Sequence, residues 1–327
     1  MFKLINFGNV LNPSILFFSL GLFAQVVKSD LKLPADLVKS ITIYLLLGIG
    51  IHGGVELAHS DMQGAGLAIL VAVLLGVAIP LFSFVILHKL GKLDPFNAIA
   101  VAAHYGSVSA GTFLTAIAFL ESLDIPYEKY PVMMLVMMES PAILVGLMLA
   151  DYYRKTVTGA GNVAVNARQL VRESLTNGSV ILLLGGLLIG NIIPDKNLKI
   201  ISPFFDQMFM GVLCIFLLSM GMEAGKKLSD FKNSSLFLII FGTAMPLILG
   251  CIGVILGRYL LGFSVGGATL MAVLAGSASY IAVPPAMRVA IPEANPSIYL
   301  TLTLGITFPF NVIIGIPAYY NFANYLG

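Results

Sequence analysis

The stretch LAGSASYIAVPP, residues 274–285, lies inside a long apolar segment, yet it holds two serines and two successive prolines. A related stretch, AHYGSVSAGT, occupies residues 103–112. Both contain the pattern Gly-Ser-x-Ser, which begins at Gly106 and at Gly276. Lipid offers no hydrogen-bond partners, so non-helical backbone at membrane depth has to be buried in protein or line a cavity. The two stretches therefore predict two interrupted membrane helices.

The prolines indicate where the second interruption ends. Proline suits the first turn of a helix, because the N–H group that it lacks has no intrahelical partner there. We expect helices over 264–277 and 284–290, with a break at 278–283. Glycine tolerates backbone angles that other residues resist, and the first stretch holds Gly106 and Gly111. By analogy we expect the following segments there: helices over 96–105 and 110–121, and a break at 106–109.

The composition of the whole chain fits only a membrane protein. Of its 327 residues 58% are hydrophobic and 10% are charged, and the mean hydropathy is +0.96, whereas soluble proteins carry about 25% charged residues. The net charge of +2 comes without any long basic run, which argues against a nucleic-acid partner. The sequence holds no nucleophile elbow, HExxH, P-loop or dinucleotide fingerprint. We therefore expect neither an enzyme nor a bound cofactor.

Ten apolar stretches are long enough to cross the hydrocarbon core of a bilayer, which is about 30 Å thick. They cover 13–28, 35–55, 64–88, 96–121, 128–153, 173–193, 203–224, 234–260, 264–290 and 297–320. One long polar connection, 154–172, divides the chain into a first half, 1–153, and a second half, 173–327, with five spans each. This organisation predicts an all-α polytopic membrane protein.

Basic residues suggest the orientation, because lysine and arginine concentrate on the cytoplasmic side. With the N-terminus outside, thirteen of the 18 Lys and Arg residues fall on the inner side and five on the outer side. We therefore expect a multi-pass protein of the inner (plasma) membrane with both termini outside and 154–172 in the cytoplasm.

The two halves resemble each other in four places and in the same order. The pairs are LLLGIGIHGGVEL (45–57) with FLLSMGMEAGKKL (216–228), GVAIPL (76–81) with GTAMPL (242–247), AVAAHYGSVS (100–109) with AVLAGSAS (272–279), and ESPAILVG (139–146) with TFPFNVIIG (307–315). Five crossings are an odd number, so the second copy enters the membrane upside down. Two inverted five-helix repeats are the plan of many secondary transporters.

Two broken helices that cross would bring two helix N-termini to the middle of the membrane. Each N-terminus carries unpaired N–H groups and about half a positive charge, which suits a small anion. The candidate anion site consists of these residues: Gly106, Ser107, Ser109, Gly276, Ser277 and Ser279. The opposing interpretation is that glycine and serine here only allow close helix packing.

A cation site is expected beside the anion. An ionisable residue within a span is costly and is by default a functional hypothesis, and Glu139 lies in the fifth span. Helix-end carbonyls and hydroxyls also suit Na⁺, so the candidate ligands are Thr112, Glu139, Thr307 and Asn311. A packed, paired acid is the alternative for Glu139. His104, a lone histidine before the first break, is expected to be structural.

The run GSASYIAVPPAMRVAIPEANPSIYLTLTLGITFPFNVIIGIP, residues 276–317, resembles the sodium-dependent bicarbonate transporter family, whose members include the cyanobacterial SbtA permeases. LLLGIGIHGGVEL and the Gly-Ser-x-Ser stretches fall in the same order. The resemblance implies Na⁺-driven uptake of bicarbonate, bound between the two broken helices, by an elevator-like sliding movement. It also implies a homotrimer and, in cyanobacteria, a PII-like cytoplasmic regulator.

Two departures from the family pattern bear on the substrate. The family leads us to expect Gly-Ser-Thr where Ala110, Gly111 and Thr112 stand, and aspartate at Glu139. A sodium-coupled symporter of bicarbonate is therefore the leading hypothesis. The alternatives are a transporter of another small anion, such as a carboxylate, and an anion sensor that transports nothing.

Overall fold

The computed structural model describes residues 13–58, 64–158, 178–230 and 235–327. Within these ranges all regular structure is helical. The helices are α2 (Pro13–Val26), α3 (Ala35–Ala58), α4 (Ala65–Val85), α5 (Pro95–Gly106), α6 (Ala110–Glu121), α7 (Tyr130–Thr158), α9 (Gly178–Ile192), α10 (Asp195–Ser202), α11 (Phe209–Asp230), α12 (Leu236–Ile255), α13 (Val265–Gly276), α14 (Val283–Ala290), α15 (Pro296–Leu300), α16 (Phe308–Phe310) and α17 (Ile316–Tyr325). Short π-helical turns connect or extend several of them, at Ile86–Leu90, Pro203–Gln207, Leu256–Leu260, Thr301–Thr307 and Asn311–Gly315.

Six helical segments in the described part of the chain are long and apolar enough to cross a membrane. They are Ala35–Val55, Ala65–Leu90, Tyr130–Thr156, Lys196–Lys227, Leu236–Leu260 and Pro296–Tyr325. The remaining predicted spans correspond to shorter helices, among them Pro13–Val26 and Val180–Ile192. The all-helical membrane protein is confirmed, while ten crossings remain a prediction. The expected connection 154–172 begins within α7, and its residues from 159 onward lie outside the described ranges.

Both predicted interruptions are present, each within one residue of its expected bounds. The first non-helical segment is 107–109, because Gly106 still belongs to α5. The second is 277–282, because α13 ends at Gly276 and α14 begins at Val283. The expected helix bounds were also off by one at the starts of α5 and α13, where Asp94 and Ser264 act as N-caps.

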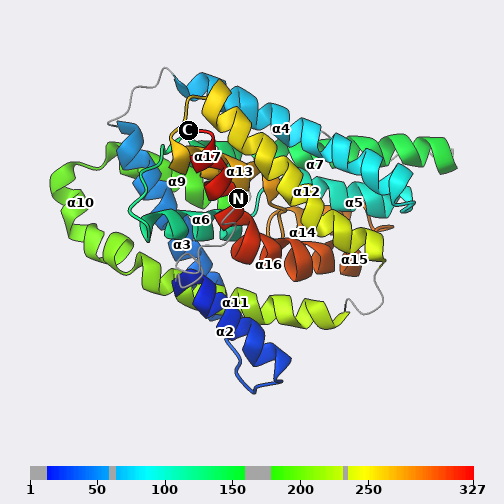
Figure 1. Ribbon diagram of the computed structural model, residues 1–327, viewed down its shortest axis with the longest axis horizontal. Coiled ribbons are helices and arrows are strands. Elements are labelled where there is room, and N and C mark those ends of the chain that lie inside the picture. Colours follow the sequence, from blue (N-terminus) through cyan, green and yellow to red (C-terminus); the bar gives the residue numbers. More distant parts are fainter. Residues whose placement is uncertain (1–12, 59–63, 159–177, 231–234) are drawn as a thin grey trace.

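The helices of the two halves are interleaved. α3 packs along α9, and α2 packs along α11, which Figure 1 shows side by side. Glycines allow the backbones to approach: a Cβ on Gly190 would lie 2.1 Å from the carbonyl oxygen of Ile51, and one on Gly221 would lie 2.1 Å from that of Phe18. Small residues at such contacts let membrane helices pack closely. Each half thus supplies one helix to each of the two close pairs.

The broken helices occupy the other part of the bundle. α5 packs on α4 and α7, and α13 packs on α12 and α17. Both α4 and α12 contain an internal proline, Pro80 or Pro246, and both continue into a π-helical turn just before a broken helix. The order of these features is therefore the same in the two halves, as the four pairs of similar stretches predicted. That the halves are inverted relative to each other remains a prediction.

The glycine contacts give a first prediction. Gly190→Leu should lower the free energy of unfolding by about 1–3 kcal/mol or more, because the new side chain meets the α3 backbone. Gly185→Leu, on the same helix, is the matched control, because a Cβ there has nothing within 4 Å. Thermal unfolding of the purified variants in detergent measures the difference. Equal melting temperatures for the two variants would show that the α3–α9 contact is looser than described.

Candidate functional site

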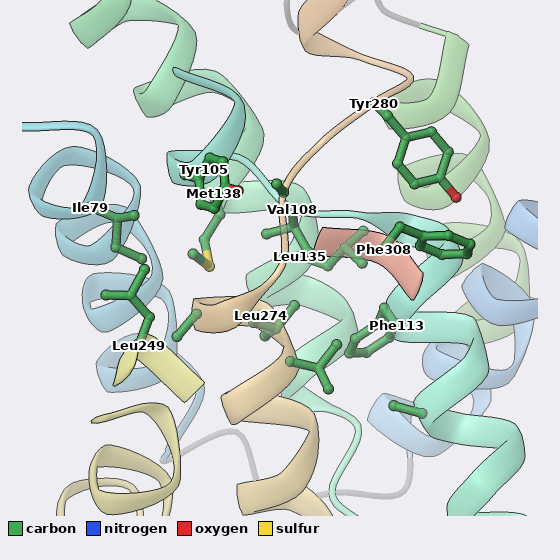
Figure 2. Packing of buried hydrophobic residues seen from close by; sticks show 14 of the residues in the cluster. Ile79, Tyr105, Val108, Phe113, Leu135, Met138, Leu249, Leu274, Tyr280 and Phe308 are labelled. Atoms are coloured by element: carbon green, nitrogen blue, oxygen red, sulfur yellow. The ribbon is translucent and has the colours of Figure 1, made fainter. Parts of the chain in front are cut away.

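The two interruptions touch each other. The backbone N–H of Ser109 donates to Oγ of Ser277 (3.1 Å), and the backbone N–H of Ser279 donates to the carbonyl of His104 (2.8 Å). Figure 2 shows the extended segment after α13 passing beside Val108 of the first break. The serines of both motifs are buried, with at most 2% of their surface exposed. The two predicted breaks are therefore in direct contact, and we call this contact region the crossing.

Both breaks begin with the same backbone conformation. Ser107 has φ −92° and ψ 169°, and Ser277 has φ −102° and ψ 169°. Each residue turns from helix to extended chain directly after its glycine. The last-turn carbonyl groups of a helix lack intrahelical partners. The two C-terminal ends therefore present carbonyl oxygens to the region of the crossing.

The two helices that start at the breaks differ as anion sites. Ser109 caps α6, since its Oγ accepts from the backbone N–H of Thr112 (3.1 Å) and from the Thr112 hydroxyl (2.9 Å). The first turn of α14 contains Pro284 and Pro285, which have no N–H to donate. Pro284 and Pro285, which indicated the break in the sequence, therefore also remove two backbone N–H donors from the start of α14. The α6 N-terminus is the better of the two for an anion.

Glu139 lies at the crossing. It comes from α7, is 4% exposed, and its Oε2 has no hydrogen-bond partner. It lines a small cavity of about 10 Å³, which has room for about one water molecule. The lining residues are Leu46, Val108, Ser109, Ala110, Glu139, Ser279, Tyr280, Ile281 and Ala282. A buried carboxylate without a partner favours a bound cation or a proton.

Thr307 has a different environment from Glu139. Its hydroxyl donates to the carbonyl of Gly242 (2.9 Å) and is hydrogen-bonded to Tyr105. Gly242 stands four residues before Pro246, which lacks the N–H that would bond this carbonyl in a regular helix. Thr307 therefore supports the kinked helix α12, and it does not line the small cavity.

Asn311 reaches the second break from the other side. Its Nδ2 donates to the carbonyl of Gly276 (2.9 Å), and its Oδ1 accepts from the Tyr319 hydroxyl (2.9 Å). The same hydroxyl lies 2.9 Å from the carbonyl of Pro246. Asn311 thereby satisfies the last carbonyl of α13, outside the lining of the small cavity. The four candidate sodium ligands thus do not share one set of contacts.

His104 is part of the scaffold around the crossing. Its Nδ1 lies 2.6 Å from the carbonyl of Ala100, one turn earlier in α5, and its ring stacks on Tyr299 at 4.5 Å. Its own carbonyl accepts from Ser279. These contacts agree with the structural interpretation of this histidine.

Tyr280 is a residue of the site that the sequence did not reveal. It follows Ser279 in the chain and reaches the first turn of α6, where a Cβ on Gly111 would lie 2.1 Å from the Tyr280 hydroxyl oxygen. Gly111 is thus required by this close approach. Tyrosine reads as apolar in a hydropathy pattern, so the only available signal was its position directly after the serine motif.

A larger cavity of about 660 Å³ adjoins the small one. It lies between α3, α9 and α11 and the second break, and it shares Leu46, Tyr280 and Ile281 with the small cavity. Lys39 and Glu223 are its charged lining residues. The arrangement connects the crossing with one end of α3 and of α9.

A cation at the crossing would have hydroxyl, carbonyl and carboxylate ligands. The described residues contain no group of three or more His, Cys, Asp or Glu side chains placed to hold a metal ion. Oxygen ligands of this kind suit hard cations rather than transition metals. The site therefore fits a hard cation better than zinc or iron.

The family assignment agrees with this geometry. The chain belongs to the Na⁺-dependent bicarbonate transporter superfamily, whose family model matches residues 13–324. This is a family of transporters and not of enzymes, which confirms the prediction made from the sequence motifs. A search of curated proteins found no match.

The contacts of Thr307 give a second prediction. Thr307→Val should lower the free energy of unfolding by about 1–3 kcal/mol, because it leaves the Gly242 carbonyl buried without a donor. Thr243→Val is the control, since this hydroxyl donates only to carbonyls of its own helix. Thermal unfolding in detergent, with and without Na⁺, measures both effects. A normal melting temperature combined with loss of the Na⁺ effect would instead make Thr307 a sodium ligand.

Proposed function

We propose that this member of the superfamily is a sodium-coupled symporter that imports bicarbonate by alternating access. The observation that carries the proposal is the buried Glu139 carboxyl group, whose Oε2 has no hydrogen-bond partner and which lines the same small cavity as Ser109 and Ser279. The crossing supplies donors for an anion, and the carboxylate supplies charge for a cation. Two ions of opposite sign can therefore bind side by side.

Glu139 is the proposed core of the sodium site, and Thr112, which bonds the cavity-lining Ser109 without lining the cavity itself, is the proposed second ligand. Thr112 donates its hydroxyl proton to Ser109, so the lone pairs of Thr112 Oγ1 remain for a cation. Asn311 and Thr307 contribute by fixing the backbone around the second break, through Gly276 and Gly242. The cation then balances the negative charge of the Glu139 carboxylate, whose Oε2 has no hydrogen-bond partner in the protein.

The proposed bicarbonate site lies at the first turn of α6. The anion accepts from backbone N–H groups there and from the serine hydroxyls of both motifs; the residues are Gly106, Ser107, Ser109, Gly276, Ser277 and Ser279. The Oγ of Ser107 is buried without a hydrogen-bond partner, so it is available to a ligand. A dedicated arginine or lysine is unnecessary at a helix N-terminus.

Coupling between the ions follows from their charges. An ionised Glu139 without a cation repels an anion at the neighbouring break, and in a low-dielectric interior this repulsion is strong. Sodium removes the repulsion, so each ion raises the affinity for the other. Symport rather than exchange is the expected result.

The cavities support a transport cycle. The small cavity holds about one water molecule, so bicarbonate requires the surroundings to move before it can bind. The larger cavity, which shares part of the lining, is the proposed route to one side of the membrane. The elevator-like movement would displace the broken helices relative to the pairs α3–α9 and α2–α11.

Several broader features belong to the same proposal. They are ten helices in two inverted repeats, residence in the plasma membrane with both termini outside, a homotrimer, and a PII-like cytoplasmic regulator. The orientation rests on the distribution of basic residues, and the last two rest on the family resemblance.

Another small anion is the second candidate. Gly111 removes a hydroxyl that the family pattern leads us to expect, and the Tyr280 hydroxyl packs against this position. A changed set of hydroxyls could favour a carboxylate. Competition of unlabelled anions against labelled bicarbonate separates the two.

The third prediction tests the transport function. An inward Na⁺ gradient should drive uptake of labelled bicarbonate into proteoliposomes. Ser109→Ala with Ser279→Ala should lower this uptake by about tenfold or more, because each missing hydrogen bond to a charged ligand removes about 1.5–3 kcal/mol. Ser83→Ala, a buried serine of α4, is the control. Uptake that does not depend on Na⁺, or that survives in the double variant, contradicts the proposal.

The fourth prediction separates the cation from the anion. Sodium should raise the thermal stability of the purified protein, by up to about 2.7 kcal/mol at a hundredfold excess over its dissociation constant. Glu139→Gln should abolish this stabilisation, because the amide carries no charge, whereas Glu139→Asp should keep most of it. The melting temperature as a function of NaCl, with choline chloride as the ionic-strength control, measures the effect. Full Na⁺ stabilisation of the Gln variant would remove Glu139 from the site.

A further inference from the structure

The loop that follows α6 is bonded to the start of α13. The Glu128 carboxylate accepts from the backbone N–H of Ser264 (2.7 Å) and from its hydroxyl (3.0 Å). Ser264 is the N-cap of α13, since its Oγ also accepts from the backbone N–H of Gly267 (3.2 Å). Hydrogen bonds to a charged group are roughly twice as strong as neutral ones. The end of one broken helix thus holds the beginning of the other.

Two glycines make this contact possible. A Cβ on Gly267 would lie 1.8 Å from Oε2 of Glu128, and one on Gly266 would lie 2.2 Å from the carbonyl oxygen of Pro126. At Gly266 the neighbour is backbone, so the loop approaches α13 at a distance that no other residue type permits, whereas a Cβ at Gly267 would displace the Glu128 carboxylate. Such a fit indicates a specific contact rather than a loop that merely rests on the helix.

A second contact of the same kind joins α14 to the start of α5. The backbone N–H of Asn295, in the loop after α14, donates to Oδ1 of Asn97 (2.7 Å) in the first turn of α5. Arg154 of α7 strengthens this region: it donates to both carboxylate oxygens of Glu293 (2.7 Å each) and to the carbonyl of Ala290 (2.6 Å). The hydrogen bond from Arg154 lowers the pKa of the Glu293 carboxyl group, so the ion pair persists below the pH at which an ordinary glutamate takes up its proton.

The four half-helices consequently form a closed circuit. It runs from α5 through the first break to α6, by Glu128 to α13, through the second break to α14, and by Asn295 back to α5. The breaks bond to each other in the middle. In Figure 1, α5, α14 and α15 lie together at one side of the bundle, with α6 and α13 toward the other. We call the Glu128–Ser264 contact and the Asn295–Asn97 contact the two clasps. The first lies roughly 18 Å from the second break along α13, and the second lies roughly 18 Å from the first break along α5, since each helix has 12 residues.

We propose that Glu128 is a positioning residue, which through Ser264 fixes α13 and thereby the geometry of the second break. The inference rests on the proposed function only for its effect on transport. Its structural part, that a carboxylate at the far end of α13 controls order at residues 277–282, stands independently. Glu128 contacts neither proposed ion.

Hydrogen exchange monitored by mass spectrometry tests the structural part. Glu128→Ala should raise the exchange rate of the amides in 277–282 by about tenfold or more, because a charge-assisted hydrogen bond that restrains α13 is lost. Glu128→Gln keeps an acceptor for the Ser264 N–H and should restore most of the protection. Glu121→Ala is the matched control: this carboxylate, from the end of α6, accepts from Tyr127 of the same loop. Unchanged exchange at 277–282 in a folded Glu128→Ala protein overturns the proposal.

A second variant approaches the contact from α13. Gly267→Ala pushes against the Glu128 carboxylate and should raise exchange at 277–282 as Glu128→Ala does. The combined variant should exchange no faster than the worse single variant, because the clash and the bond involve the same two groups. Additive increases would show that the two residues act separately, which contradicts the proposal. This cycle remains informative if one single variant is poorly stable.

Transport kinetics test the functional part. Glu128→Ala should raise the apparent KM for Na⁺ and for bicarbonate by about threefold or more, and Glu128→Gln should recover it. A purely structural role would lower the amount of folded protein and hence the maximal rate, with KM unchanged. Absent uptake by the unmodified protein refutes the proposed function while leaving the exchange result valid. If Glu128→Ala changes hydrogen exchange at 277–282 but leaves KM unchanged, the Glu128–Ser264 contact contributes only to stability, and its role in positioning the site is refuted.

Discussion

The backbone at the two breaks has to find hydrogen-bond partners inside the protein, because the surrounding lipid provides none. The structure meets this constraint by bringing the breaks together. Ser109 donates its N–H to the Ser277 side chain, and Ser279 donates to the His104 carbonyl. Either break alone would leave these groups buried without partners. The crossing is therefore a condition for having broken helices at all, and the ion site is a consequence of it.

The same constraint explains the polar side chains around the crossing. Pro246 frees the Gly242 carbonyl, and Thr307 bonds it; the end of α13 frees the Gly276 carbonyl, and Asn311 bonds it. Glu139 differs from these residues, because one of its carboxylate oxygens is buried with no partner. This oxygen belongs to the carboxylate that lines the small cavity with Ser109 and Ser279, and that combination is why an ion is expected there.

Much of the fold could be predicted from the sequence, because the relevant signals are local. Gly-Ser-x-Ser followed by Pro284 and Pro285 located the breaks to within one residue. The roles of Thr307 and Asn311 could not be read in this way, since their partners lie 65 and 35 residues away along the chain. Tyr280 escaped notice because an apolar ring hides its hydroxyl in a hydropathy pattern. Glu128 is the first residue of the predicted span 128–153, and because it lies at the very end of that span it was not among the polar groups expected within the membrane.

The pairing of α2 with α11 has a consequence for biosynthesis. Gly221, which packs on the α2 backbone, stands 200 residues after Gly21, whose own missing side chain admits the backbone at Leu218. At ribosomal speeds of about 5–20 residues per second, α2 waits roughly 10–40 s for its partner to be made. During that interval its glycine surface faces lipid or the insertion machinery. The α2–α11 pair thus forms late, only after more than two thirds of the polypeptide has been made.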